Sequence, residues 1–180
     1  MKKIKSIALF TLALGLFACG EETKTSEEST TATTAEVPAD DYKGMEIVNL
    51  ATYGIDAEMY IADATKGKQE FRTTEWESLE IEVGKKYGIE LVPFGLSVAE
   101  KKEELAGDLV YTIEYLEDTP SKIIYKKIIA NNDIEEIHFL VNVDINGEPH
   151  TIKSLNKNYN EKAIQKMAMS AESLSVKNPA

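Results

Sequence analysis

The sequence predicts one α+β domain over residues 42–180, in which an antiparallel β-sheet, made of a meander and a hairpin, is covered by helices. Three observations lead to this fold class. Apolar and polar residues alternate over several short segments, which is the pattern of half-buried strands. The dipeptide Asn146-Gly147 marks a hairpin turn. An apolar stripe at helical spacing lies near the C-terminus.

The sheet is predicted mainly from the second half of this domain. Three alternating segments are expected as strands joined by short turns, which makes an antiparallel meander. These segments are 109–115, 123–129 and 137–145, and the second turn falls at Asn131-Asn132-Asp133. Asn146-Gly147 then returns the chain through 148–155, because both central residues of a type I′ turn require positive φ. Four earlier strands are expected at 46–51, 57–62, 76–83 and 87–92.

Two helices are expected to cover the sheet. Ser97 and Glu100 have the spacing of a capping box, and Gly107 suits the C-terminal end of that helix. Asn160 caps a second helix, whose apolar stripe is expected to pack on the sheet. The stripe comprises Ala163, Ile164, Met167, Ala168, Ala171 and Leu174.

The segments 49–55 and 167–174, together with a central helix rich in Glu and Lys, resemble the Mog1/PsbP-like α/β sandwich of uncharacterised Bacteroidetes-type outer-membrane lipoproteins. The resemblance spans most of 46–176 and includes no catalytic motif. Members of the wider fold include adaptor proteins that bind a protein partner and photosystem accessory subunits. The resemblance therefore implies a binding or accessory role and leaves the ligand unidentified.

The N-terminus has the features of an export signal. A basic start precedes an apolar run of 13 residues, whereas a bilayer-spanning helix needs about 20. Leu16, Phe17, Ala18 and Cys19 resemble the lipobox of bacterial lipoproteins, in which the chain is cut before the cysteine and the thiol receives a diacylglyceryl group. We expect residues 1–18 to be a lipoprotein signal peptide. Cys19, the only cysteine, is the expected lipidation site, with acyl chains such as palmitate as the anchor.

An ordinary secretory cut is the alternative at this place. Ala18-Cys19-Gly20 fits the small-x-small cleavage pattern, and Phe17 departs from the small or β-branched residue usual in a lipobox. That cut would follow Gly20 and discard the only cysteine, so the lipoprotein interpretation is preferred. Lipidation of Cys19 also removes the free thiol. Disulfides, cysteine-bound metals and cysteine nucleophiles are therefore excluded.

Residues 19–41 are rich in Glu, Ser, Thr and Ala and carry a net charge of −6. Such a composition cannot bury enough apolar surface to offset the entropy of ordering, so a disordered acidic tether is predicted after the lipidated cysteine. Glu21-Glu22 resembles the surface-export tags of some lipoproteins. The alternative is that this segment is a solvated spacer that carries no sorting signal. The expected location is the outer membrane, at its periplasmic face or at the cell surface.

Charge restricts the partners of the folded domain. The net charge of −11 becomes −14 when the three lysines of the signal peptide are removed. This acidity argues against nucleic acid or an anionic membrane surface as the partner of the domain, and no basic cluster is visible along the chain. The lipid on Cys19 provides the expected membrane attachment, and a protein or glycan of the envelope is the candidate partner.

The two histidines are not expected to form a metal site. With Asn146-Gly147 as a two-residue turn, His150 faces Val143 and His138 faces Leu155, so the histidines point to opposite faces of the sheet. The segment 142–147 partly imitates a calcium loop. Lys153 occupies the twelfth position, where calcium needs a bidentate Glu. No metal and no cofactor other than the covalent lipid is predicted.

Carboxylates provide the alternative functional hypothesis, because two carboxylates in different environments can divide acid and base roles. The candidates are Glu75, Glu77, Glu80 and Glu82 before or along one strand, and Glu100, Glu103 and Glu104 on the first helix. Glu103 and Glu104 stand beside Lys101 and Lys102 on a helix face that is expected to be solvated, so a charged surface is the preferred interpretation. Nucleophile motifs and phosphate-binding glycine loops are absent from the sequence, so no catalytic residue is assigned.

These observations favour a membrane-anchored envelope lipoprotein with a non-catalytic binding or accessory domain. A carboxylate-dependent hydrolase and a structural envelope subunit are the alternatives. A deep pocket with two convergent carboxylates would favour the hydrolase, whereas an exposed apolar patch would favour partner binding.

Overall fold

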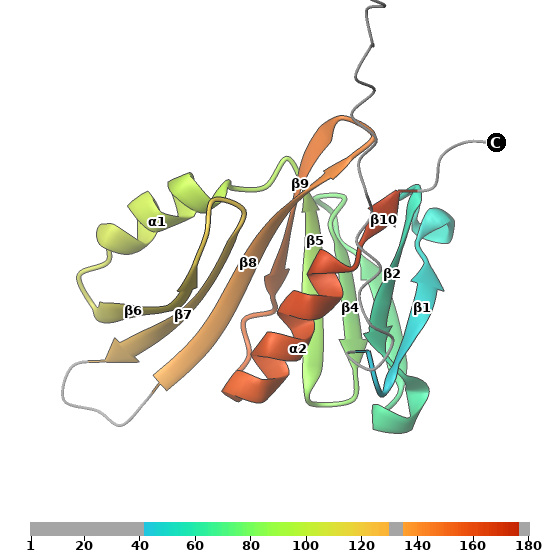
Figure 1. Ribbon diagram of the computed structural model, residues 1–180, viewed down its shortest axis with the longest axis horizontal. Helices are drawn as coiled ribbons and strands as arrows, with labels where there is room; N and C mark the ends of the chain where they lie inside the picture. Colours follow the sequence, from blue (N-terminus) through green and yellow to red (C-terminus); the bar gives the residue numbers. More distant parts are fainter. Residues whose placement is uncertain (1–41, 130–134, 177–180) are drawn as a thin grey trace, which may run out of the picture. The chain divides into compact units, whose positions relative to one another are not determined.

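Antiparallel strands dominate the fold (Figure 1). The computed structural model describes residues 42–129 and 135–176, and 49% of these lie in strands and 21% in helices. The lipobox with Cys19, the tether and the turn at 131–133 lie outside the described residues. Both core clusters and every described strand pairing belong to the compact unit Val37–Ala180, which therefore contains a complete core.

The strands fall into two sheets. The smaller sheet has the order β1-β2-β10, and the larger has the order β3-β4-β5-β9-β8-β7-β6, with every neighbouring pair antiparallel. The strands are β1 Met45–Asn49, β2 Ala57–Ala62, β3 Gln69–Thr73, β4 Leu79–Val83, β5 Tyr87–Pro93, β6 Tyr111–Asp118, β7 Lys122–Ile129, β8 Glu135–Ile145, β9 Glu148–Ser154 and β10 Ser175–Val176. The helices are α1 Val98–Ala106 and α2 Glu161–Glu172, with short 3-10 helices η1 Ala51–Tyr53 and η2 Ala64–Lys66.

The predicted fold class, an α+β sandwich with helices covering one sheet, is wrong. The protein is richer in strands than that class, and its strands form two sheets. Two strands account for much of the difference. β3 was not predicted because Phe71 is its only large apolar side chain, and β10 has only two residues. Alternation shows that a segment is a strand but does not show which sheet it joins.

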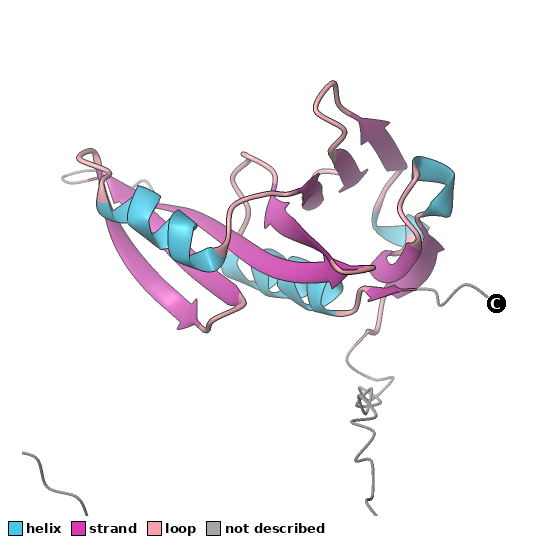
Figure 2. Cartoon of the chain, turned by 90° about the horizontal axis from the view of Figure 1, so that it is seen from above, coloured by secondary structure: helices cyan, strands magenta, loops and turns pink. Residues whose placement is uncertain are grey.

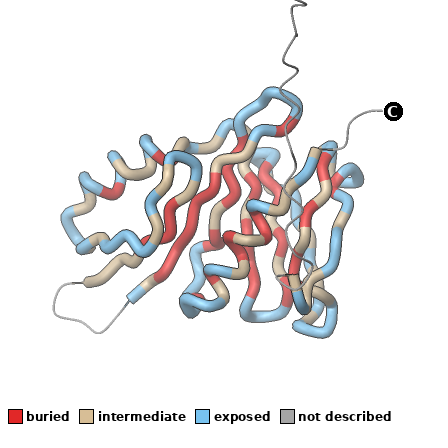
Figure 3. Tube along the Cα trace, viewed as in Figure 1, coloured by how far each residue is buried: buried red, intermediate tan, exposed pale blue. Residues whose placement is uncertain are grey.

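The two helices lie on opposite faces of the large sheet (Figure 2). Apolar side chains of α2 share the main core with odd-numbered residues of β8 such as Phe139, while α1 packs on Leu140 of the same strand. Successive residues of a strand point to opposite faces, so these two cores are separated by the sheet. The buried residues follow the strands of the large sheet and the inner side of α2 (Figure 3).

Several local predictions are confirmed. Ser97 and Glu100 form a complete capping box at the start of α1. The side chain of Asn160 accepts a hydrogen bond from the backbone N–H of Ala163 at the start of α2. Asn146 and Gly147 have φ angles of 56° and 85°, as a type I′ turn requires.

Candidate functional site

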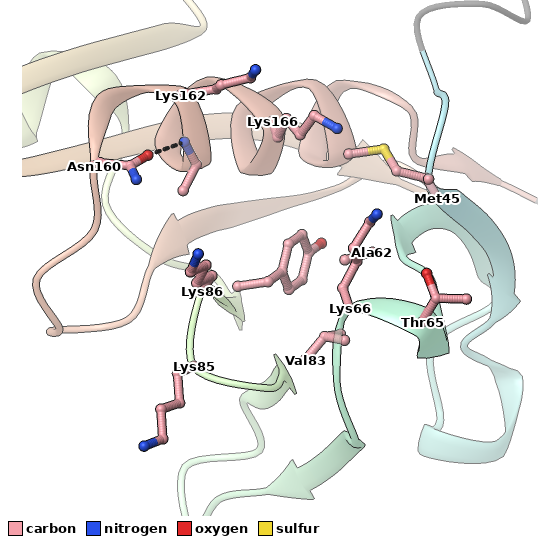
Figure 4. A pocket seen from close by; sticks show the side chains of 13 residues that line it. Met45, Ala62, Thr65, Lys66, Val83, Lys85, Lys86, Asn160, Lys162 and Lys166 are labelled. Carbon is pink, nitrogen blue, oxygen red and sulfur yellow. Dashed lines mark hydrogen bonds between the residues drawn. The ribbon is translucent and has the colours of Figure 1, made fainter.

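A cleft of about 620 Å³ lies between α2, η2, the start of β1 and the turn that joins β4 to β5. We call it the lysine cleft. Lys162 and Lys166 come from α2, Lys85 and Lys86 from the β4–β5 turn, and Lys66 from η2 (Figure 4). The remaining lining residues are Gly44, Met45, Ala62, Thr65, Val83, Tyr87, Asn160 and Ala163.

The ammonium groups of these five lysines form no ion pair among the described residues. Elsewhere in the described ranges, every lysine or arginine except Lys43 is ion-paired with a carboxylate. The paired residues are Lys68, Arg72, Lys101, Lys102, Lys122, Lys126, Lys127, Lys153 and Lys157. No acidic residue lines the cleft. Unneutralised positive charge is therefore concentrated at this one place in an acidic domain.

The positive charge of the cleft acts on Asp63, a carboxylate outside the cleft lining. Thr65 donates hydrogen bonds to Asp63 through its hydroxyl and its backbone N–H, and these bonds lower the pKa of Asp63. The charges of Lys66 and Lys166 lower the same pKa further, although by less. Lys166 also donates a hydrogen bond from Nζ to the backbone carbonyl of Lys43, at 3.3 Å.

Two glycines bring the lysine-bearing segments of the cleft together. Gly67 follows η2 and Gly84 begins the β4–β5 turn, and both have positive φ. A Cβ atom on Gly67 would lie 2.5 Å from the Cα of Gly84, closer than a side chain tolerates. This backbone contact holds Lys66 beside the turn that carries Lys85.

The floor of the cleft is apolar and uncharged. We define the floor as Met45, Ala62, Val83, Tyr87 and Ala163. Val83 is 1% exposed and Tyr87 is 5% exposed. Burial raises the pKa of Tyr87, so its hydroxyl stays neutral at physiological pH.

The other polar side chains of the cleft are already hydrogen-bonded. The Tyr87 hydroxyl lies 2.6 Å from the Ser170 hydroxyl, and Thr65 donates its proton to Asp63. The Oδ1 atom of Asn160 accepts a hydrogen bond of 2.9 Å from the Ala163 backbone. The chemistry that the cleft offers a ligand is therefore positive charge beside apolar surface.

The hairpin register places one of the two histidines. His150 faces Val143 across β8 and β9, as predicted, and the β8–β9 pairing ends before it reaches His138 and Leu155. The Nδ1 atom of buried His138 lies 3.1 Å from the Ser154 hydroxyl. Its burial lowers its pKa. Within the described ranges, no group of three His, Cys, Asp or Glu residues is arranged to hold a metal.

The segment that imitates a calcium loop stabilises the hairpin and α1. The Oδ1 atom of Asn142 accepts a hydrogen bond of 2.7 Å from the backbone N–H of Val98, and its Nδ2 atom donates to the Leu96 carbonyl at 3.0 Å. The Oδ1 atom of Asp144 accepts from the N–H of Gly147 at 2.7 Å. Both side chains are thus engaged in the fold.

The structure does not join the two carboxylate groups of the hydrolase hypothesis. On β4, Glu80 pairs with Arg72 and Glu82 pairs with Lys157. On α1, Glu100 belongs to the capping box, Glu104 pairs with Lys101 at 2.7 Å, and Glu103 is exposed. Glu75 and Glu77 are exposed in the loop before β4. No hydrogen bond or ion pair of the described residues connects the two groups.

Comparisons with protein-family models, with curated proteins and with solved structures gave no match. In the part of the chain that the structure describes, no helix has the length and apolar composition needed to cross a membrane.

Sequence reasoning missed the lysine cleft, and the expectation that the chain has no basic cluster is wrong for the folded domain. Its five lysines come from three segments that are distant in sequence. Two local signals were present: Lys85-Lys86 stands between two predicted strands, and Lys162 and Lys166 are one helical turn apart on the polar side of the predicted C-terminal helix.

Proposed function

We propose that this protein is a membrane-anchored envelope lipoprotein whose folded domain binds an organic anion, without catalysis, in the lysine cleft. The observation that carries the proposal is the gathering of five unpaired lysines around one cavity in a domain whose other cations are almost all paired. The volume of about 620 Å³ falls in the range of small-molecule sites. Clustered positive charge attracts and retains an anion.

The carboxylates support a binding role over a hydrolytic one. Glu80 and Glu82 point away from the cleft, on the face of β4 opposite to Val83, and each has a basic partner. An acid–base pair for hydrolysis needs two carboxylates that converge on a cavity. The cavity described here is lined by cations instead.

Anion binding is tested with the unit 37–180 and citrate as the probe, by isothermal titration calorimetry at low and high salt. We expect saturable binding that weakens as the ionic strength rises. The double variant Lys85→Glu/Lys86→Glu should weaken citrate binding at least tenfold.

The control is Lys101→Glu/Lys102→Glu, which changes the net charge equally but lies on α1, outside the cleft. Because these two lysines are ion-paired with Glu104 and Asp118, circular dichroism of this variant checks that its fold is intact. Its citrate affinity should stay within about twofold of the wild type. Equal losses in both double variants would show that citrate responds to net charge alone. That outcome would refute the site. The site would also be refuted if none of the tested anions binds.

The anchor is tested on the whole chain in bacterial membranes. Because the Cys19 thiol is the lipid acceptor in this proposal, Cys19→Ser should abolish acylation and release the protein from the detergent phase. Mass spectrometry of the wild type should find acyl groups on an N-terminal cysteine peptide. A mature N-terminus at Glu21 would contradict the lipoprotein assignment.

A further inference from the structure

The lysine cleft has two chemically different zones, and together they define a ligand class. Its rim carries the ammonium groups of the five lysines, four of which are exposed. Its floor is made of Met45, Ala62, Val83, Ala163 and the Tyr87 side chain. A ligand that satisfies both zones carries its charge at one end and hydrocarbon at the other.

Neutral polar ligands fit the cleft poorly. A sugar brings many hydroxyl groups, and each must exchange its bonds with water for bonds with the protein. The hydroxyls of Tyr87 and Thr65 and the Oδ1 atom of Asn160 already have partners inside the protein. The neutral side chains of the described lining therefore offer a glycan few unengaged groups, such as the Nδ2 amide of Asn160, to replace the water around it.

The floor also disfavours a compact anion without hydrocarbon. Such an ion would meet the lysines but would leave Met45 and Ala163, the partly exposed side chains of the floor, facing water. An apolar chain lying on the floor removes that surface from water as well as its own. Charge alone would account for the rim but leaves the apolar floor without a role.

We propose that the ligand of the lysine cleft is a single-chain amphipathic anion, with a compact anionic headgroup held by the lysines and a hydrocarbon chain on the floor. This inference rests on the proposed function, because it names the class of anion. Carboxylate and monoalkyl phosphate headgroups share this chemistry. The ammonium groups hold either one through charge-assisted hydrogen bonds.

The test compares probes on the unit 37–180 below their micellar concentrations, by calorimetry. The carboxylate series is butyrate, hexanoate and octanoate, and octyl phosphate provides the second headgroup. Affinity should rise two- to fourfold for each added methylene, since a fully buried methylene contributes a factor of about four. Neutral 1-octanol should bind at least tenfold more weakly than octanoate.

Two variants separate the zones. Met45→Gln keeps the size of a partly exposed floor side chain and adds polarity, so octanoate should bind several-fold more weakly while citrate is unaffected. Lys85→Glu/Lys86→Glu should weaken the binding of both octanoate and citrate. Circular dichroism of each variant establishes that the fold is intact, and Ala163→Ser provides a second floor variant.

The outcomes distinguish this inference from the proposed function. If citrate binds but affinity is independent of chain length, the amphipathic ligand is refuted and the anion site stands. If octanol binds as tightly as octanoate, the headgroup assignment to the lysines is refuted. If octyl phosphate binds much more tightly than octanoate, the headgroup of the ligand is a phosphate. If octanoate binds much more tightly than octyl phosphate, the headgroup is a carboxylate. If neither citrate nor any alkyl anion binds, both proposals are refuted.

Discussion

The hydroxyl of Tyr87 on β5 lies 2.6 Å from the hydroxyl of Ser170 on α2. Ser170 donates its own proton to the backbone carbonyl of Tyr60 on β2. Because Ser170 has a single proton, Tyr87 must be the donor to it. This chain of two hydrogen bonds connects the large sheet, α2 and the small sheet at the cleft floor.

Ser170→Ala should destabilise the domain by about 2–4 kcal/mol, because it leaves both the Tyr87 hydroxyl and the Tyr60 carbonyl without a partner in a buried region. Tyr87→Phe should cost only about 1 kcal/mol, because Ser170 keeps its bond to Tyr60. Urea denaturation of the two variants measures the difference. A larger loss for Tyr87→Phe would reverse the assigned direction of the hydrogen bonds.

The buried tyrosines should make the domain sensitive to alkali. Desolvation raises the pKa of Tyr87 above its ordinary value of 10.0. The folded state therefore retains the proton where the unfolded chain loses it. This contribution to stability is complete below pH 10 and declines as the pH rises above it. Thermal unfolding from pH 8 to 11 should show the decline, and Tyr87→Phe should reduce its slope.

Tyr159 carries a buried hydroxyl with no hydrogen-bond partner among the described residues, and desolvation raises its pKa to about 12. Tyr159→Phe removes this unsatisfied group, so stability should stay within about 0.5 kcal/mol of the wild type or increase.

Gly88 lies against the hydroxyl of Tyr159, and an added Cβ would be 2.2 Å from it. Gly88→Ala should therefore destabilise by about 1–3 kcal/mol. Chemical denaturation of both variants tests this contact, and a tolerated Gly88→Ala would contradict it.

His138 should make the domain less stable in mild acid. Burial lowers its pKa below 6.5, an effect opposed by Glu136 and assisted by Lys127 and Lys101. The unfolded chain binds this proton at a higher pH than the folded domain does, so the stabilising contribution is present above pH 6.5 and is lost as the pH falls below it. Comparing wild type with His138→Gln between pH 7.5 and 5.5 isolates this effect from the carboxylates. An unchanged slope in the variant would exclude His138 as its source.

Gly147→Val tests the β8–β9 turn. The residue has a φ of 85°, and a β-branched side chain is strained there, so the loss should be about 1–3 kcal/mol. Nothing lies within 4 Å of a Cβ at this position, so steric overlap does not contribute. Asn146→Gly provides the matched control, since glycine accepts the positive φ and should cost less than 1 kcal/mol.

Features governed by neighbours along the chain could be predicted from the sequence. The hairpin register that pairs Val143 with His150 follows from Asn146-Gly147, and the caps at Ser97 and Asn160 follow from spacing within one helical turn. Each depends on residues close in sequence, whose geometry is restricted by backbone sterics.

Features that depend on distant segments could not be predicted. Ser170 of α2 and Ser173, which caps that helix, bind the backbone of Tyr60, beyond the two residues of β2 that pair with β10. Neither serine differs in pattern from a surface residue. The cleft lysines are also ordinary surface residues along the chain. Their significance arises when tertiary packing places Lys66 near the β4–β5 turn.

The position of Met45 has a mechanical consequence. Met45 is the first residue of β1, and among the described strands β1 pairs with β2 alone, through five residue pairs. Met45 also lines the lysine cleft. If Cys19 is fixed in a membrane, a pulling force on the domain reaches it through β1 and acts first on this wall of the cleft. A ligand that contacts both Met45 and α2 would resist the peeling of β1. The presence of a ligand in the lysine cleft would then determine the force at which the domain begins to unfold.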